Sequence, residues 1–197
     1  VLFDGSDVTG APAHERARLG ITRTFQITSV FANLTTFDNV RAATYRTNAT
    51  GWWAALTRSA AWRREEADID ARAREVLDFC DLGAQAGIRA DSLSYGEQRR
   101  LEVAIALAAE PRLLLLDEPA AGLNPEEGQR LVSIIRKVRD RGVTVLLVEH
   151  HMRVVMGVCD RIVVLDHGAL IAEGAPRDVA NDANVIRVYL GREQAHA

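Results

Sequence analysis

Four consecutive leucines that run into two acidic residues constrain the fold of this chain more than any other feature. Leu113 to Leu116 lead directly into Asp117 and Glu118 within the stretch RLLLLDEPAAGLNP. An apolar run without polar alternation is typical of a strand that is covered on both faces, as in a parallel α/β sheet. The acidic pair then stands at the carboxyl end of the strand, where open α/β sheets bind their ligands.

The acidic pair has the chemistry of a phosphate-hydrolysing site. Mg²⁺ prefers hard oxygen ligands, so Asp117 is a candidate metal ligand. Glu118 can orient or deprotonate an attacking water. Taken alone, the pair leaves two interpretations equally open, a hydrolytic site and a buried strand that happens to end in two acids.

Composition places the chain among ordinary globular proteins. It has 197 residues, of which 48% are hydrophobic and 26% charged, and these values argue against disorder. The net charge of -3 gives no electrostatic reason to expect a nucleic-acid partner. No apolar run approaches about 18 residues, the length of a membrane span, and no signal peptide is visible. The chain begins at Val1 rather than at Met, and we expect it to be a fragment.

The stretch from about Ser29 to Ala109 has a helical rather than a strand pattern. The first apolar stripe consists of Phe31, Leu34, Phe37 and Val40. The second stripe consists of Ile69, Ala73, Val76, Leu77 and Cys80. We place Gly83 at the end of the second helix, and we expect Trp52, Trp53, Leu56 and Trp62 to form an aromatic cluster. The fold predicted is an α/β core with an inserted all-helical lobe, in which Cys80 and Cys159 pack in the interior rather than form a disulfide.

Further strands are expected on both sides of this lobe. The alternating stretch Ile21 to Ile27 predicts a strand that ends near Gln26, and Val143 to Val148 predicts a second buried strand. Asn124 and Pro125 predict the start of a helix that runs to about Arg141.

The segment Ser94-Tyr95-Gly96-Glu97 has two possible meanings. Serine followed three residues later by glutamate is a capping box that starts a helix. Exposed N–H groups at a helix N-terminus beside a glycine also suit a phosphate.

Histidines follow the predicted strand that ends at Val148. His150 is a structural residue unless a phosphate site lies beside it, in which case it can hydrogen-bond the phosphate. We do not expect His150 and His151 to bind a metal, because adjacent side chains tend to point apart and no third ligand is evident. Gln26 is either a polar loop residue or a hinge residue whose amide contacts the metal or its water.

Together, and in this order, the motifs resemble the ATP-binding cassette (ABC) ATPase family. The matching residues are Gln26 for the Q-loop, Leu93 to Glu97 for the signature sequence (LSYGE), Leu113 to Asp117 with Glu118 for Walker B, Ala121 to Asn124 for the D-loop, and His150 for the switch histidine. The resemblance covers nearly the whole chain. It implies a P-loop NTPase-like (RecA-like) α/β core that carries the helical lobe, with the N-terminal part of the core absent.

Within the family, the chain is similar to the ATPases of branched-chain amino acid importers. The similar stretches are TRTFQ, LSYGEQRRLE, DEPAAGLNP, VEHHM and VIRVYLG. Tyr95 replaces the second glycine of the general signature, and Asn124 replaces the D-loop aspartate; both departures agree with this subgroup. His151 stands where the subgroup often has an acidic residue. The lipopolysaccharide-export ATPases end in a similar VYLG segment and remain an alternative.

The resemblance implies ATP and Mg²⁺ at the site. Glu118 and His150 are the implied catalytic residues, and Asp117 and Gln26 are the implied metal-binding residues. The implied nucleotide-binding residues are Gln26, Ser94, Tyr95, Gly96, Glu97 and Asn124. Three parts are expected: residues 1–28 as the remaining N-terminal core, 29–109 as the signature lobe, and 110–197 as the C-terminal core.

Partners and location also follow from the resemblance. A second ATPase subunit, identical or related, is expected to pair head to tail, so that Ser94 and Gly96 of one subunit meet the ATP of the other. The helical lobe is expected to contact membrane permeases, with Phe31 and Phe37 as candidate contacts. The protein would lie on the cytoplasmic face of the membrane and serve an external substrate-binding protein indirectly.

A P-loop is missing from this sequence. The chain contains no GxxxxGK[ST] run, and its one lysine, Lys137, lies in an amphipathic helical stretch. We therefore expect these 197 residues alone not to hydrolyse ATP. Two alternatives remain. The first is an ATPase that acts on DNA or ribosomes, but such proteins usually carry long coiled coils or a basic surface, and neither is visible in this sequence. The second is a truncated remnant that only offers its signature face to a partner.

Overall fold

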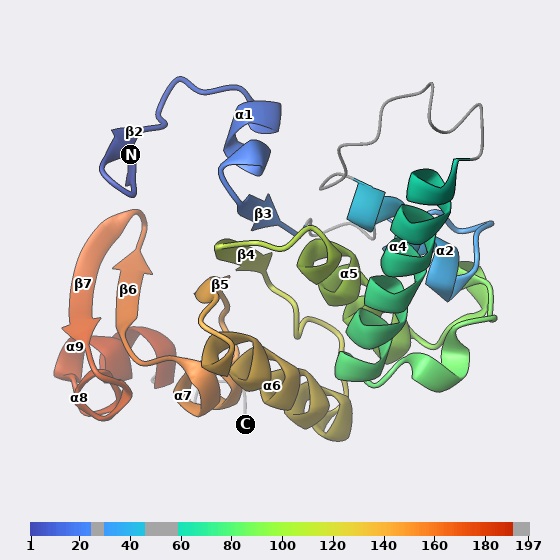
Figure 1. Cartoon of the computed structure of the whole chain (residues 1–197). Coiled ribbons are helices and arrows are strands. Elements are labelled where there is room, and N and C mark those ends of the chain that lie inside the picture. The colour runs from blue at the N-terminus through green and yellow to red at the C-terminus, as the bar shows by residue number, and fades with distance from the viewer. Residues whose placement is uncertain (25–29, 46–58, 191–197) are drawn as a thin grey trace. The chain divides into compact units, whose positions relative to one another are not determined.

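The structure, a computed structural model, describes residues 1–24, 30–45 and 59–190. It divides into two compact units, Val1–Val148 and Glu149–Ala197, which are taken separately below. Figure 1 shows the elements of both units with the labels used here.

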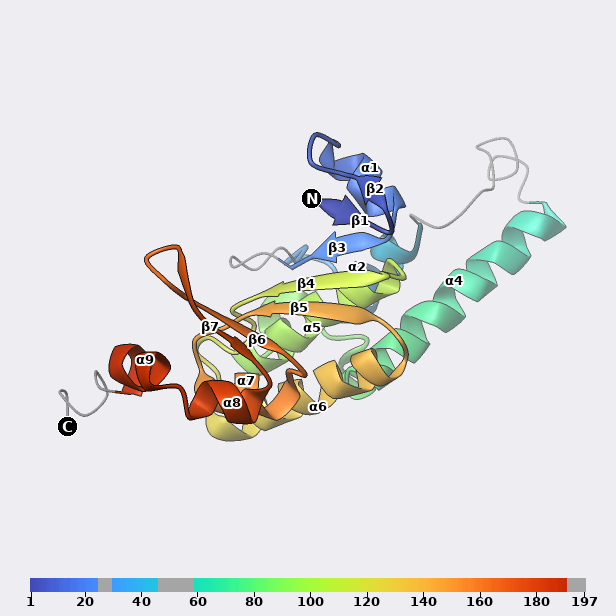
Figure 2. The same ribbon diagram turned by 90° about the vertical axis from the view of Figure 1, so that its left-hand side faces the viewer.

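The sheet of the first unit contains three parallel strands. These are β3 (Ile21–Arg23), β4 (Leu113–Asp117) and β5 (Thr144–Val148), and β4 lies in the middle. Figure 2 shows the three strands side by side. Leu115 is paired with Arg23 on one side and with Leu146 on the other. The predicted parallel sheet is confirmed, and Asp117 closes its central strand.

The two faces of this sheet differ in burial. Leu114 and Leu116 are 0% and 1% exposed, whereas Leu146 and Val148 on β5 are 57% and 56% exposed. Successive side chains of a strand point to opposite faces. The covered face belongs with α6, which contacts β5 and buries Leu131, Ile134 and Ile135. The expectation that Val143 to Val148 is a buried strand is therefore wrong for one of its faces.

The regular secondary structure that is described between β3 and β4 consists of helices, apart from one isolated bridge between Thr35 and Arg89. Its elements are α2 (Thr36–Thr44), α4 (Ala60–Phe79), the short 3-10 helices η2 (Gly83–Gln85) and η3 (Ala90–Ser92), and α5 (Tyr95–Ala108). The long α4 packs against both α2 and α5.

The second predicted stripe is confirmed as the buried face of α4. Ile69, Ala73, Leu77 and Cys80 are at most 2% exposed. Burial raises the pKa of the Cys80 thiol to about 12. The predicted helix end at Gly83 is wrong, because α4 ends at Phe79 and the left-handed backbone is at Asp81, with φ of 55°. Gly83 instead begins η2.

The first predicted stripe is only partly helical. Phe31 and Leu34 precede α2 and are 63% and 40% exposed, whereas Val40 within α2 is fully buried. The helix begins late because the Thr35 side chain accepts a hydrogen bond from the Asp38 N–H and so caps it. Trp52, Trp53 and Leu56 of the expected aromatic cluster lie outside the described residues.

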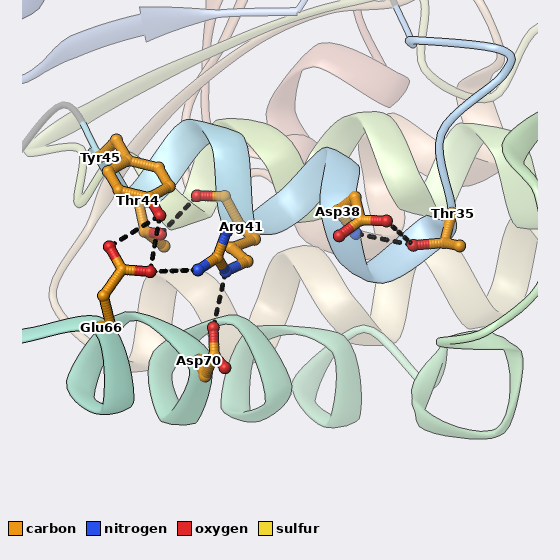
Figure 3. Close-up of polar contacts among 7 residues, drawn as sticks. All are labelled: Thr35, Asp38, Arg41, Thr44, Tyr45, Glu66 and Asp70. Carbon is orange, nitrogen blue, oxygen red and sulfur yellow. Dashed lines mark hydrogen bonds and ion pairs between the residues drawn. The ribbon is translucent and has the colours of Figure 1, made fainter. Parts of the chain in front are cut away.

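A polar cluster joins α2 to α4 (Figure 3). Arg41 Nε donates to Asp70 Oδ1 at 2.6 Å, and its guanidinium also contacts Glu66. The Tyr45 hydroxyl donates to Glu66 Oε1 at 2.9 Å. One arginine of α2 is thus held between two acids of α4, and this arrangement fixes how the two helices pack.

The first unit also contains a hairpin and two further helices. They are the hairpin β1 (Leu2–Phe3) and β2 (Ser6–Asp7), the helix α1 (Ala13–Arg18), and α6 (Pro125–Asp140). Asn124 caps α6, and Gly142 follows it with φ of +84°. The predicted helix from Asn124 to Arg141 is confirmed.

The second unit is a hairpin surrounded by short helices. Its elements are α7 (Met152–Val158), β6 (Ile162–Asp166), β7 (Ala169–Gly174), α8 (Pro176–Ala180), α9 (Ala183–Val185) and the π-helical turn η4 (Ile186–Leu190). A small core contains Val155, Ile162, Val164, Val179 and Val185. Among the helices described in the two units, none has the length and apolar character needed to cross a membrane.

Candidate functional site

The acidic pair lies where the central strand ends. Asp117 is the last residue of β4, and Glu118 follows with φ of 45°. The Glu118 N–H donates to Val148 O at 2.9 Å, which extends the contact with β5 by one residue. A left-handed backbone is unfavourable for a residue with a side chain, and such positions gather at functional sites. The local turn therefore ends the strand abruptly at the two carboxylates.

Asp117 is held by a cation from the neighbouring strand. Arg23 Nη2 lies 2.9 Å from Asp117 Oδ2, and the Asp117 side chain is 25% exposed. The carboxylate supplies the hard oxygen donors that Mg²⁺ prefers, so its chemistry fits this ion. A metal that binds here has to compete with the guanidinium of Arg23.

The N-terminus of α5 has the features of an anion site. Ser94 caps the helix: its Oγ accepts from the Glu97 N–H at 3.3 Å, and Glu97 Oε2 accepts from the Ser94 N–H at 2.9 Å. The Ser94 N–H is the main cause of a lowered pKa at Glu97. The predicted capping box is confirmed. Among the described residues, no acceptor faces the N–H groups of Tyr95 and Gly96, so these groups fit a phosphate.

A second capping box begins α6. Asn124 Oδ1 accepts from the N–H groups of Glu126 and Glu127 at 3.0 Å each, and Glu127 Oε2 accepts from the Asn124 N–H at 3.0 Å. Asn124 is therefore committed to the start of α6 in this structure.

The two helix starts lie against each other. A Cβ added at Gly96 would lie 2.4 Å from Glu127 Oε1, so this position has no room for a side chain. The Tyr95 hydroxyl donates to Ala121 O at 3.1 Å. The structure thus brings together the signature segment, Leu93 to Glu97, and the D-loop segment, Ala121 to Asn124.

Two predicted site residues are not joined to this arrangement. Gln26 lies outside the described residues. His150 belongs to the second unit, so its expected meeting with Asp117 stays a prediction.

The histidine pair differs from expectation. The rings of His150 and His151 lie with centroids 4.3 Å apart, and ligand atoms of Glu149, His150 and His151 all lie within 4.8 Å of one another. The expectation that the two side chains point apart without a third potential ligand is therefore wrong. Glu149 Oε2, however, already accepts from both histidine N–H groups at 2.9 and 3.0 Å and lies 3.0 Å from His151 Nδ1. The three residues form a hydrogen-bonded turn around this carboxylate.

Besides the contact of Tyr95 with Ala121, sequence reasoning missed three contacts at the site. They involve Arg23 with Asp117, Arg99 with Tyr95, and Gln85 with Glu97. The alternation in the strand around Arg23 marks a side chain on one sheet face, but not its partner 94 residues away. Arg99 stands four residues after Tyr95 on one helix. Residues at this spacing are neighbours on a helical face, so this contact could have been predicted from the sequence.

Comparison with known proteins agrees with the family that the motifs resemble. The model of the ABC transporter family matches residues 1–121, and that of the branched-chain amino acid ATP-binding cassette transporter matches residues 169–195. The high-affinity branched-chain amino acid transport ATP-binding protein BraF of Pseudomonas aeruginosa is 42% identical over 97% of this chain and 75% of its own length. The corresponding LivG of Salmonella typhimurium is 40% identical over 92% of this chain and 72% of its own length.

Two further comparisons concern the alternative of a lipopolysaccharide-export ATPase and the fold. The lipopolysaccharide export system ATP-binding protein LptB of Acidithiobacillus ferridurans is 37% identical over 97% of this chain and 73% of its own length. The solved structure of MJ1267, an ATP-binding cassette of an ABC transporter, matches with a TM-score of 0.79 and 26% identity, and the match covers 95% of this chain and 75% of that one. This chain belongs to the ABC transporter family, and the complete protein is one of the ATPases of that family.

Proposed function

We propose that this protein is the ATPase subunit of an importer for branched-chain amino acids or related small amides. One observation carries the assignment of the site: the start of α5, where the described residues offer no acceptor to the N–H groups of Tyr95 and Gly96, packs against the segment that follows the acidic pair. The substrate class is supported by the names of BraF and LivG and by the second family match at residues 169–195.

The site residues divide into two sets under this proposal. Asp117 and Gln26 would hold Mg²⁺, which when bound neutralises phosphate charge. Glu118 orients or deprotonates the attacking water, and His150 hydrogen-bonds the γ-phosphate and holds that water. Asn124 keeps the D-loop in place from the start of α6.

The second set serves the ATP of a partner subunit. The α5 N-terminus carries a partial positive charge, and the N–H groups of Tyr95 and Gly96 have no acceptor in the part of the chain that the structure describes. Ser94 adds a hydroxyl, which in this structure is bound to Glu97 at 2.9 Å. Two cassettes arranged head to tail complete each other's sites, and either an identical or a related chain can serve as the partner.

Phe31 is the proposed contact with the membrane permeases. It is 63% exposed, and the buried Asn39 holds its backbone from both sides, with the Phe31 N–H at 2.8 Å from Oδ1 and the Phe31 carbonyl at 3.1 Å from Nδ2. A large exposed ring on a fixed backbone is suited to binding a partner. Phe37 is half-buried beneath Arg74, 5.3 Å from its ring centre, and therefore belongs to the packing of the lobe.

The proposal extends to location and domain organisation. Through its permeases the protein would sit on the cytoplasmic face of the membrane, and a substrate-binding protein would act on the opposite side. Residues 1–28 and 110–197 would form the ATPase core, and residues 29–109 would form the signature lobe.

Reconstituted transport tests the proposal. The complete gene product is assembled with its permeases in vesicles, and ATP-dependent uptake of leucine is compared with that of unrelated solutes. Glu118→Gln is expected to abolish hydrolysis and uptake. Glu126→Gln is the matched control, because this exposed acid lies one helix turn from Arg130 and outside the site. ATP hydrolysis that responds to lipopolysaccharide-export components but not to amino acid permeases would support the LptB-like alternative instead.

A further inference from the structure

We propose that Tyr95 is a positioning residue that fastens the signature segment to the D-loop segment of the same chain, so that the two meet the partner subunit as one rigid surface. This inference rests on the proposed function. Its basis is a set of contacts that a glycine at this position, the residue of the general family pattern, cannot make.

The first contact is the hydroxyl of Tyr95. It donates to Ala121 O at 3.1 Å and accepts from Arg99 Nε and Nη2 at 3.1 and 2.6 Å. One hydroxyl hydrogen and two lone pairs are therefore all used. The hydroxyl cannot rotate without breaking a hydrogen bond.

The arginine beneath the tyrosine is itself fixed. Arg99 is 7% exposed, its guanidinium carbon lies 5.0 Å from the centre of the Tyr95 ring, and its Nη1 lies 3.0 Å from Glu102 Oε2. Charge-assisted hydrogen bonds in a buried setting are strong and hold their geometry. The anchor for Tyr95 is therefore the body of α5, not a mobile surface group.

The D-loop backbone lies directly against the ring. Gly122 has φ of +75°, and a Cβ built on it would lie 3.1 Å from Tyr95 Cε1. The backbone conformation favours glycine at this position, and a Cβ here would make a contact with the ring that is tighter than an ordinary van der Waals contact. The ring and the loop thus fit each other in shape as well as through the hydrogen bond.

Other contacts hold the same turn from either side. Gly96 packs against Glu127, whose carboxylate caps the Asn124 N–H. On the lobe side, Gln85 Nε2 donates to Glu97 Oε1 at 3.0 Å. The first turn of α5 therefore connects the helical lobe to the D-loop, and a displacement of Ser94 displaces Ala121 to Asn124 with it.

Steady-state ATPase kinetics of the complete protein, assembled with its permeases, test the inference. Tyr95→Phe removes only the hydroxyl. We expect kcat to fall by about fivefold or more with the KM for ATP unchanged within about twofold, because the loss lies in the alignment of the closed pair of subunits. Tyr45→Phe is the matched control: Tyr45 and Tyr95 are 42% and 43% exposed, and each has an arginine over its ring and a hydroxyl that donates to an acceptor. An unchanged kcat in Tyr95→Phe, or an equal fall in Tyr45→Phe, overturns the proposal.

A double-variant cycle provides a second test that does not need activity. Gly122→Ala is introduced into the complete protein with Tyr95 and into the Tyr95→Gly variant, and urea unfolding is measured. The cost of the positive φ is common to both backgrounds and cancels. A smaller loss of stability in the Tyr95→Gly background supports the contact, and equal losses overturn it. If the unmodified protein shows no ATPase activity, the proposed function fails, whereas the cycle still tests the contact.

Discussion

Arg23 Nη2 donates to Asp117 Oδ2 at 2.9 Å, so a cation from β3 holds the proposed metal ligand at the end of β4. The strand register pairs Arg23 with Leu115, and the arginine side chain therefore extends along the sheet toward its carboxyl edge to reach Asp117. The ion pair keeps the carboxylate in place before a metal binds.

Removing this cation should strengthen metal binding. In Arg23→Gln the complete protein should reach half-maximal ATPase at a Mg²⁺ concentration that is lower by up to about fivefold, because an exposed ion pair contributes up to about 1 kcal/mol. The measurement is a Mg²⁺ titration at saturating ATP. Arg130→Gln, which removes an arginine of similar exposure from an ion pair on α6, should leave the titration unchanged. A higher Mg²⁺ requirement in Arg23→Gln would show that Arg23 assists the metal instead of competing with it.

The backbone conformation of Glu118 should lower the stability of the folded protein, although its side chain is needed for hydrolysis. Its φ of 45° is unfavourable for a side-chain-bearing residue but not for glycine. We expect Glu118→Gly to abolish hydrolysis and to raise the free energy of unfolding by about 0.5 to 1 kcal/mol, after the entropic cost of glycine is subtracted. Glu118→Ala, which keeps Cβ, should abolish hydrolysis without this gain. Urea unfolding checks both, and a destabilised Glu118→Gly would mean that the carboxylate contributes more to folding than the strained turn costs.

The 197-residue chain alone should not hydrolyse ATP. It lacks a P-loop run, and its one lysine, Lys137, lies on α6 with Nζ 3.8 Å from Asp81 Oδ1. Phosphate release from the purified chain should therefore equal that of its Glu118→Gln variant. Activity that this substitution removes would refute the expectation.

Cys80 should be unreactive in the folded protein and should make stability depend on alkaline pH. Burial raises its pKa from 9.0 to about 12, so almost no thiolate forms at pH 8. The unfolded chain loses the thiol proton above pH 9 while the folded chain keeps it, so stability should fall between pH 9 and pH 12. Cys80→Ala should reduce this fall.

Thiol labelling at pH 8 separates the two cysteines. Cys159 is only half-buried and should react first, whereas Cys80 should react only in denaturant. Rapid labelling of Cys80 in the native protein would contradict its burial.

The features predicted well from the sequence are local ones. The capping residues Ser94 and Asn124 act within one helix turn, and the leucine run of β4 is continuous in sequence. Each of these features depends only on residues that are close in the sequence, and each could be predicted for that reason.

The features that were missed depend on distant partners. Whether β5 is covered on both faces depends on which elements pack on the sheet, not on its own residues. The pairs Arg23 with Asp117 and Tyr95 with Ala121 join segments 94 and 26 residues apart. The helix end at Phe79, with the left-handed backbone at Asp81 instead of Gly83, reflects a competition in which the packing of Cys80 and Leu82, both fully buried, outweighs the backbone preference of glycine.

The hydrogen bond from Glu118 to Val148 has a consequence for motion in the protein. Val148 is the last residue of the first unit, and its carbonyl carbon is bonded directly to the nitrogen of Glu149, where the second unit starts. The boundary between the units is therefore one covalent bond away from the group that holds the Glu118 backbone. A rotation of the Val148–Glu149 peptide would therefore act on the amide of the proposed water-activating residue before any side chain of the site is touched.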